Sequence, residues 1–411
     1  MTDSLSYRRL LRLDGMPELM LAACLLRLAG RIFTLAIVLY VLARFDSPVL
    51  AGWVAFASLA PGLIVSPLAG AMLDRLGAAK AIVVDMAVSA ALVLALALVD
   101  VAAAMTEPLL LALVALYSFT SPLGTAGVRV LIPRLVPPDA LDRANALDTS
   151  SYALISVAGP AVAGVLFGFA GAQVTLLAVA FLYAAGTASL VPLVRRASTG
   201  VAAATGSLTR SALQGVMYVV RSPSLRGLAI SYSLFQVSWG ILIVAVPVVV
   251  LNELGRGATA DSLIGGLWAV SGLAGGMGAI YAAHLRTDGR ERQFIAIGAL
   301  ATAVALYPLS ASFGLVGLAA GLILVGFLEG PVDVGVLSLR QRRTDPAWLG
   351  RVLAVSMSFN MSGQPLGSAI GGIVVVLSPS LAFAIAALAS VLAAIAAYLL
   401  VPAAPEREAV S

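Results

Sequence analysis

The chain of 411 residues has little charge for its length. Only 11% of its residues are charged, whereas 61% are hydrophobic, and its mean hydropathy is +1.03. A soluble domain of this size needs a far larger charged surface, so the composition predicts a polytopic membrane protein. The net charge of +5 does not indicate nucleic acid, because the basic residues sit in short connections between apolar runs rather than beside aromatic ones.

The sequence is also poor in the side chains that enzymes and metal sites use. Cys24 is its one cysteine, which excludes an intrachain disulfide, and His284 is its one histidine. There is no H-E-x-x-H motif and no G-x-x-x-x-G-K-[ST] loop, so a metal-dependent intramembrane enzyme and an ATP-driven pump are not supported. No enzymatic activity, cofactor or metal is therefore expected.

Apolar windows of about 20 residues, the length that crosses the hydrocarbon core, recur along the whole chain. They predict an all-α fold of twelve transmembrane helices, with the following approximate bounds: 18–43, 49–73, 81–104, 108–131, 146–169, 172–194, 226–251, 262–284, 293–312, 314–338, 351–377 and 380–401.

Basic residues are unevenly shared between the two sides of this array. The two termini and the even-numbered connections hold 21 of the 25 Lys and Arg, whereas the odd-numbered connections hold only Arg44 and Arg256. The positive-inside rule then places both termini in the cytoplasm, which predicts a multi-pass protein of a bacterial-type inner membrane.

An internal repeat divides the chain in two. "IPRLVPPDALDRANAL" (132–147) recurs as "QRRTDPAWLGRVLAV" (341–355), and the same offset carries Gly159 onto Gly367 and Gly164 onto Gly372. Two homologous six-helix halves in one orientation are typical of a secondary transporter with a central pathway. The expected domains are two bundles, a cytoplasmic linker and a cytoplasmic tail: 1–194, 226–401, 195–225 and 402–411.

The twelve spans, duplicated halves and long central connection resemble the major facilitator superfamily over essentially the whole chain. "GAMLDRLGAAK" (70–80) is similar to the cytoplasmic signature of that family, with matches at Gly70, Asp74, Arg75 and Gly77. The repeated segments and "QPLGSAIGG" look most like the branch of enterobactin exporters and macrolide-efflux proteins. The resemblance implies two pseudo-symmetric six-helix bundles that work by alternating access.

The signature predicts a cytoplasmic gate. Asp74, at the end of a helix, is expected to accept hydrogen bonds from a neighbouring helix N-terminus and from Arg129. Asp85, near the inner end of the third span, is interpreted as scaffolding for this gate. The alternative is a solvated loop that only sets topology.

A second motif in the fifth span points to export. "AGPAVAG" (158–164), with Gly159, Pro160 and Gly164, is similar to the Gly-Pro signature of antiporters in the superfamily. The chain departs from its branch in the first span, because Arg31 follows Gly30 where relatives often carry an acid. The coupling chemistry of those relatives therefore does not transfer directly.

Charged residues inside the predicted spans are the main candidates for function. Arg27 and Arg31 lie one turn apart in the first span, and Glu329 and Asp333 lie one turn apart in the tenth. Arg27 lies about 14 Å from the inner end of its helix and Glu329 about 12 Å from the inner end of its own. Under the repeat, the two acids fall on Thr120 and Gly124, so each charged pair belongs to one half only.

Intramembrane charges usually mark a pathway, and in the resembled fold both of these helices line the central cavity. We expect Arg27 to interact with Glu329 across the cleft, Arg31 and Asp333 to extend the charged lining, and Glu329 to carry protons. The alternative is a static salt bridge, with Arg31 snorkelling to the interface. Four further mid-span residues are candidates for the cavity lining: Tyr117, Gln236, Trp239 and Asn360.

These features favour a proton-coupled exporter of small amphipathic molecules, such as drugs, siderophores or secondary metabolites. The alternative is a uniporter or symporter of an anionic metabolite bound by Arg27 and Arg31. A non-transporting membrane sensor would leave the paired charges unexplained. The expected partners are a small-molecule substrate, protons and the lipid bilayer, with the protein acting as a monomer and without nucleic acid.

Overall fold

The computed structural model describes residues 7–137, 140–197, 208–284, 289–310, 313–345 and 349–403, and these ranges contain helices and no strand. The first half of the chain forms α1 (Tyr7–Leu10), α2 (Met16–Phe45), α3 (Pro48–Ala57), α4 (Ala60–Leu76), α5 (Ala78–Val101), α6 (Glu107–Leu135) and α7 (Leu141–Ala197). After α8 (Leu208–Arg221), the second half forms α9 (Pro223–Leu254), α10 (Ala258–His284), α11 (Glu291–Ala305), α12 (Tyr307–Ser310), α13 (Gly314–Arg342), α14 (Leu349–Met361), α15 (Gly363–Leu377) and α16 (Pro379–Leu400).

The predicted all-α polytopic fold is confirmed. Ten helical segments of the described chain are long and apolar enough to cross a membrane. One of them is α7, which turns back on itself at Gly171, where φ is 79° and ψ is 172°, and so supplies two spans. The eleventh predicted span is present as α14 and α15, which follow one another around Ser362 and are each too short to count alone. Together these account for twelve crossings.

Two other predicted spans contain breaks. The second span divides at Ser58–Leu59 into α3 and α4, and Pro61 lies in the first turn of α4. The ninth divides at Leu306 into α11 and the short α12, which contains Pro308. Proline has no backbone N–H and cannot donate the hydrogen bond that would continue the preceding helix. In each case the backbone hydrogen bonds of the helix are therefore interrupted, and a new helix begins at the proline.

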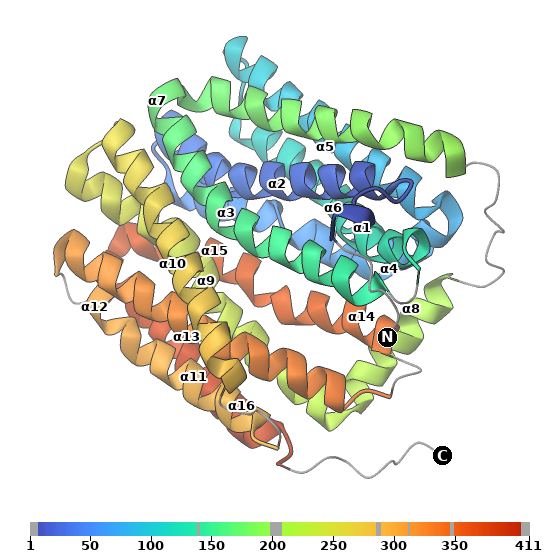
Figure 1. The fold of residues 1–411 in the computed structure, drawn as a ribbon. Helices are drawn as coiled ribbons and strands as arrows, with labels where there is room; N and C mark the ends of the chain where they lie inside the picture. The colour runs from blue at the N-terminus through green and yellow to red at the C-terminus, as the bar shows by residue number, and fades with distance from the viewer. Residues whose placement is uncertain are drawn as a thin grey trace.

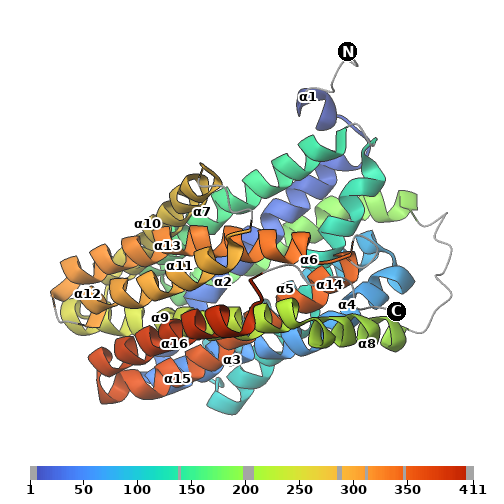
Figure 2. The ribbon, with the colours of Figure 1, turned by 90° about the horizontal axis from the view of Figure 1, so that it is seen from below.

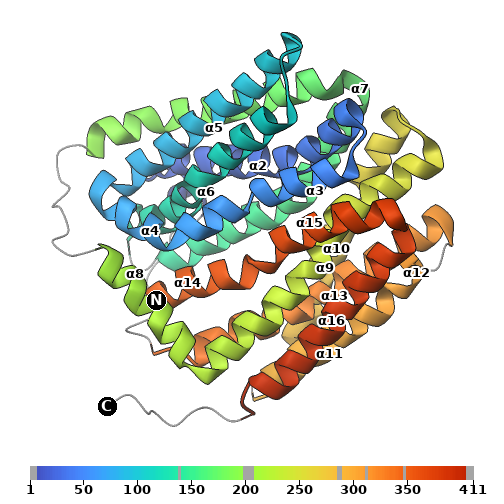
Figure 3. The ribbon, with the colours of Figure 1, turned by 180° about the vertical axis from the view of Figure 1, so that it is seen from behind.

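The helices run roughly lengthwise between two ends of the molecule (Figures 1 to 3). One end, which we call the α8 end, carries α1, α8 and the end of α16. The opposite end, the far end, carries the bend of α7 and the connections from α2 to α3 and from α9 to α10. Helix α8 contacts α4 of the first half and both α9 and α14 of the second, so it touches both bundles.

The halves meet at the far end through glycines. A Cβ on Gly164 of α7 would lie 2.8 Å from the Cα of Gly265 of α10, and one on Gly52 of α3 would lie 3.0 Å from the Cα of Gly372 of α15. Only residues without a side chain permit helix backbones to approach so closely. An ion pair between Arg256 and Asp46 joins the halves beside these crossings. The far end is therefore closed by backbone contact.

Candidate transport site between the two halves

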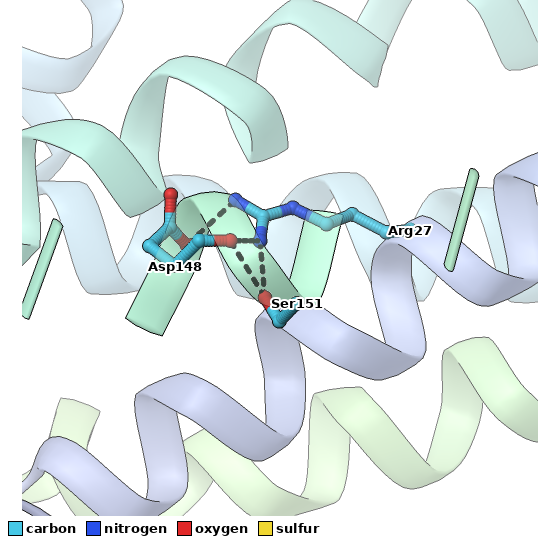
Figure 4. A network of polar contacts seen from close by, with 3 residues as sticks. All are labelled: Arg27, Asp148 and Ser151. Carbon is cyan, nitrogen blue, oxygen red and sulfur yellow. Dashed lines mark hydrogen bonds and ion pairs between the residues drawn. The ribbon is translucent and has the colours of Figure 1, made fainter. Parts of the chain in front are cut away.

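Arg27 of α2 is neutralised within its own half. Its Nη2 donates to Asp148 Oδ1 of α7 at 2.7 Å, and its Nη1 donates to the Asp148 carbonyl at 3.1 Å and to Ser151 Oγ at 3.0 Å (Figure 4). Both charged side chains are largely buried, with exposed fractions of 14% and 12%. Residues 148 and 151 lie three apart on one helix face, so α7 presents the carboxylate and the hydroxyl together to the guanidinium.

Arg31, one turn further along α2, is exposed and bonded to a neutral group. Its Nη2 donates to the Tyr152 hydroxyl at 2.7 Å. The Tyr152 ring lies beneath both arginines, with guanidinium carbons 5.5 Å (Arg27) and 5.4 Å (Arg31) from its centroid. Cation–π attraction therefore holds both arginines against one ring that is itself 44% exposed.

The acidic pair of α13, Glu329 and Asp333, belongs to the second half. Asp333 is exposed and accepts a hydrogen bond from the Tyr232 hydroxyl of α9. Glu329 is half-buried, and its Oε2 would lie 3.8 Å from a Cβ placed on Gly275 of α10. Within the described part of the chain, neither carboxylate has a basic side chain at ion-pair distance.

Arg340 lies two turns beyond Asp333 on α13 and is only 4% exposed. Its positive charge interacts electrostatically with Asp333 and with the Tyr232 between them. With the Asn360 amide oriented to satisfy its neighbours, its oxygen accepts from Arg340 and its nitrogen donates to the Ser356 carbonyl at 3.1 Å. A buried polar chain thus extends from the acidic pair toward α14.

The electrostatic link between the two charged pairs involves other partners than the predicted ones, and no ion pair joins them among the described residues. Glu329 interacts electrostatically with Arg31, as well as with Asp333 on its own helix. The predicted contact between Arg27 and Glu329 is wrong for this conformation, because Arg27 is turned toward α7 and paired with Asp148. Equal depth along two helices did not determine which way the side chains point.

The four further lining candidates are all buried. Tyr117 stacks on Phe33 at 4.3 Å, and its hydroxyl shares a hydrogen bond with that of Tyr183 inside the first bundle. The Gln236 amide nitrogen lies 3.1 Å from the sulfur of Met361, and Asn360 pairs with Arg340 as described. These three are packed rather than freely available to a ligand.

Trp239 is the exception among them. It packs against Trp268 of α10 with ring centroids 6.0 Å apart, and it is 9% exposed. Its indole nitrogen has no hydrogen-bond partner among the described residues. The indole N–H is therefore the one unsatisfied donor that these four candidates offer.

The predicted gate residues lie at the α8 end. Gly77 (φ 80°, ψ 140°) joins α4 to α5 in a conformation that favours glycine, and its N–H caps α4 through the Leu73 carbonyl at 2.9 Å. Arg75 is exposed, and the Arg129 Nη1 lies 3.6 Å from the sulfur of Met357 in the other half. The surroundings of Gly70 and of the Asp74 side chain lie outside the described part of the structure. Asp85 is buried in the first bundle against Gly124 of α6.

The motif of the fifth span has two neighbours. A Cβ on Gly159 would clash with the Cβ of Arg31, so the side chain of Arg31 can pack here only because residue 159 is glycine. The Pro160 carbonyl and Gly164 pack on Gly265 of α10. One short stretch of α7 therefore touches both the site arginine and the opposite half.

Sequence reasoning missed Asp148, Ser151 and Tyr152. The signal was present, because "LDTSSYAL" places a carboxylate, a hydroxyl and a phenol at spacings of three and four on one face of a predicted span. An acid inside a membrane helix requires a partner, and two arginines in another span are the obvious ones. Among the described residues there is no group of three or more His, Cys, Asp and Glu that could hold a metal.

Comparisons with known proteins agree with the fold and show the family. Residues 19–363 and 228–411 match the Major Facilitator Superfamily. The uncharacterized MFS-type transporter y4rN of Sinorhizobium fredii (strain NBRC 101917 / NGR234) is 48% identical over 396 residues, which cover 96% of this chain and 97% of the relative.

Solved structures share the architecture at low identity. A POT family transporter in complex with 5-aminolevulinic acid superposes with a TM-score of 0.77 at 12% identity, covering 97% of this chain and 98% of that one. A mutant of the nucleoside transporter NupG gives 0.75 at 15% identity, covering 93% and 99%. A D-xylose–proton symporter gives 0.70 at 15% identity, covering 95% and 98%. These likenesses show the fold, and with the family match and the 48% identical relative they establish that the chain is a membrane transporter belonging to the Major Facilitator Superfamily.

Proposed function

We propose that the chain is a proton-coupled antiporter that exports small amphipathic molecules by alternating access. The single observation that carries this proposal is the acidic pair of α13, which has no ion-pair partner among the described residues and of which Glu329 interacts electrostatically with Arg31 of the other half. A carboxylate in that position can take up and release a proton, whereas one locked in a strong ion pair cannot do so readily.

The two acids have different surroundings, which suggests different roles. Asp333 receives the Tyr232 hydroxyl and the electrostatic support of Arg340, both of which stabilise its charged form. Glu329 has no hydrogen bond among the described residues, and its one nearby cation is Arg31 of the opposite half. Glu329 is therefore the proposed proton carrier, and its link to Arg31 changes whenever the halves move apart.

An aromatic surface beside Arg31 favours an amphipathic substrate. The ring of Tyr152, which is 44% exposed, lies against the Arg31 guanidinium. Rings of this kind bind apolar or cationic groups while the nearby charges orient a polar one.

The arrangement in the membrane follows from the charge distribution. With 21 of the 25 Lys and Arg in the termini and even-numbered connections, the α8 end is proposed to face the cytoplasm of a bacterium and the far end the outside. Residues 1–194 and 226–401 are proposed to rock about the site, joined by the linker 195–225 and followed by the tail 402–411. The protein would work as a monomer in the inner membrane.

The export direction and the gate rest on motifs. The Gly-Pro motif of α7 and the resemblance to enterobactin exporters and macrolide-efflux proteins favour efflux. The segment from Gly70 to Gly77, with Asp74, Arg75 and Arg129, is proposed to close the cytoplasmic side in the opposite conformation. Its position at the α8 end, next to α14, supports that role.

The decisive experiment is transport into proteoliposomes with an imposed pH gradient. Wild-type protein should accumulate cationic or neutral amphiphilic dyes only when protons can be exchanged, and Glu329→Gln should abolish accumulation while leaving expression intact. Glu253→Gln, at an exposed position near the far end, is the matched control and should transport normally. Gradient-driven accumulation that survives in Glu329→Gln would contradict the proposed role of Glu329.

The anion-carrier alternative keeps one specific observation in its favour. Arg31 is exposed, its hydrogen bond goes to the neutral Tyr152 hydroxyl, and among the described residues it has no carboxylate at ion-pair distance, so its charge is more available to an anion than that of Arg27, which is paired with Asp148. A ligand at 100 times its dissociation constant stabilises a protein by about 2.7 kcal/mol. Thermal stabilisation by anionic metabolites that is lost in Arg31→Gln and kept in Glu329→Gln would favour this alternative.

A further inference from the structure

A second carboxylate lies buried in the first half and has no role in the site described above. Asp85 of α5 is 1% exposed, and its Oδ1 has no hydrogen-bond partner among the described residues. Its Oδ2 lies against Gly124 of α6, where a Cβ would come within 2.1 Å of it. The carboxylate thus fills a space that exists only because residue 124 has no side chain.

The groups around Asp85 are hydroxyls rather than cations. The hydroxyls of Ser89 on α5 and Thr120 on α6 and the backbone N–H of Gly124 lie close to the carboxylate, and among the described residues Thr120 Oγ1 has no partner at full hydrogen-bond geometry. The titratable groups that face it are Tyr117 from α6 and Tyr183 from α7, whose hydroxyls are bonded to each other. Among the described residues, no Lys, Arg or His lies at ion-pair distance from Asp85.

Burial disfavours an ionised carboxylate here, because no counter-charge lies at ion-pair distance among the described residues and the nearby hydroxyls and Gly124 N–H offer only neutral hydrogen bonds. Protonation of Asp85 removes the cost of burying a charge. A protonated Asp85 donates its O–H to Thr120 Oγ1, so two unpartnered atoms become one hydrogen bond. A bound cation would find only the oxygens of Asp85, Ser89 and Thr120, since the two tyrosine hydroxyls engage each other.

The internal repeat strengthens the case for a site rather than a structural accident. It aligns Thr120 and Gly124 with Glu329 and Asp333. The Asp85 carboxylate of α5 lies against Gly124 of α6, so in the first half a carboxylate from the neighbouring helix lies beside the position that Asp333 occupies in the second half. In the second half Asp333 is exposed, whereas in the first half Asp85 is sealed.

We propose that Asp85, with Thr120 as its hydrogen-bond acceptor, is a second proton-binding site, located in the first half and protonated in this conformation. Its part in the transport cycle rests on the proton-coupled function proposed above, but its protonation does not. A proton held in each half would tie coupling to both bundles.

The test is infrared spectroscopy of the purified full-length protein, which detects the carbonyl stretch of protonated carboxylic acids directly. Wild type should show a band that persists at pH values where exposed carboxylates are ionised. Asp85→Asn should remove that band, because the amide mimics the protonated acid without absorbing there, and Glu329→Gln should keep it. Thr120→Val should shift the band by removing the acceptor while preserving side-chain shape.

A spectrum of Asp85→Asn identical to that of wild type would overturn the proposal. A sodium-dependent rise in melting temperature, present in wild type and absent in Asp85→Asn, would also overturn it, in favour of a cation site. If Glu329→Gln continues to accumulate substrate while the Asp85 band behaves as expected, the proposed role of Glu329 fails and the second site stands.

Discussion

Replacing Asp148 by asparagine should destabilise the protein far more than the loss of an ordinary ion pair. The change leaves the Arg27 guanidinium largely buried without its counter-charge. Removing one partner of a buried pair costs about 3 to 5 kcal/mol. Arg27 keeps its bonds to the residue 148 carbonyl and to Ser151 Oγ, so we expect the lower end, about 3 kcal/mol, which corresponds to roughly a hundredfold change in the folding equilibrium.

The chain supplies a matched control on its surface. Arg196 and Asp14 form an ion pair of the same chemistry, but their side chains are 52% and 83% exposed, and Arg196 also lies 3.5 Å from Glu18. Exposed pairs contribute about 0 to 1 kcal/mol. Asp14→Asn should therefore have almost no effect on stability.

The assay is unfolding in detergent, followed by helical circular dichroism. Asp148→Asn should unfold at clearly lower temperature or denaturant than Asp14→Asn. The double variant Arg27→Gln/Asp148→Asn should recover part of the loss, because it removes the buried charge as well as its partner. Equal stability of Asp148→Asn and Asp14→Asn would refute the claim that this buried pair fixes α2 against α7.

Three further outcomes follow from the geometry. Tyr152→Phe removes one hydrogen bond but keeps the ring beneath both arginines, so substrate affinity measured by thermal shift should fall less than in Tyr152→Ala. In Gly164→Val the new Cβ would lie only 2.8 Å from Gly265 Cα, which should push the halves apart at the far end. Spin labels on the α2–α3 and α9–α10 connections should therefore report a longer distance than in wild type. Arg256→Gln breaks only an exposed pair between the halves, whose side chains are 50% and 87% exposed, and should lower stability by less than about 1 kcal/mol in the same detergent assay.

The fold could be predicted from the sequence because its dominant signal is length. Windows of apolar residues marked every crossing, and the repeat at 132–147 and 341–355 established that the halves are related. Pro61 marks a possible kink in the second span, where the structure has the break at Ser58–Leu59, whereas the break at Ser362 was not predicted. Apolar helices carry no amphipathic pattern that a break would disturb, and neighbouring helices can accommodate the interrupted backbone bonds.

The level of the charged residues along their helices could be predicted from the sequence, but the partners toward which their side chains point could not. Arg27 and Glu329 lie at similar levels, yet Asp148 lies about 10 Å from the start of α7 and is equally within reach of a long arginine side chain. Choosing between these partners requires the rotation of each helix about its axis. That rotation is set by contacts such as Gly159 against Arg31, which depend on both helices at once and leave no mark in either sequence segment alone.

The same contact connects the site to the closure of the far end. Gly159 lies against the Cβ of Arg31, while Pro160 and Gly164, within five residues on the same helix, pack on Gly265 of the other half. These are contacts of backbone with backbone or with the root of a side chain, so no flexible side chain can absorb a displacement between them. When α10 separates from α7 at the far end, this part of α7 loses its support on one side while it still holds Arg31 on the other. The position of Arg31, and with it the electrostatic contact to Glu329, then depends on whether the far end is open. A motif in which only small residues fit is what such a connection requires, because any Cβ at position 159 or 164 would force the two contacts apart.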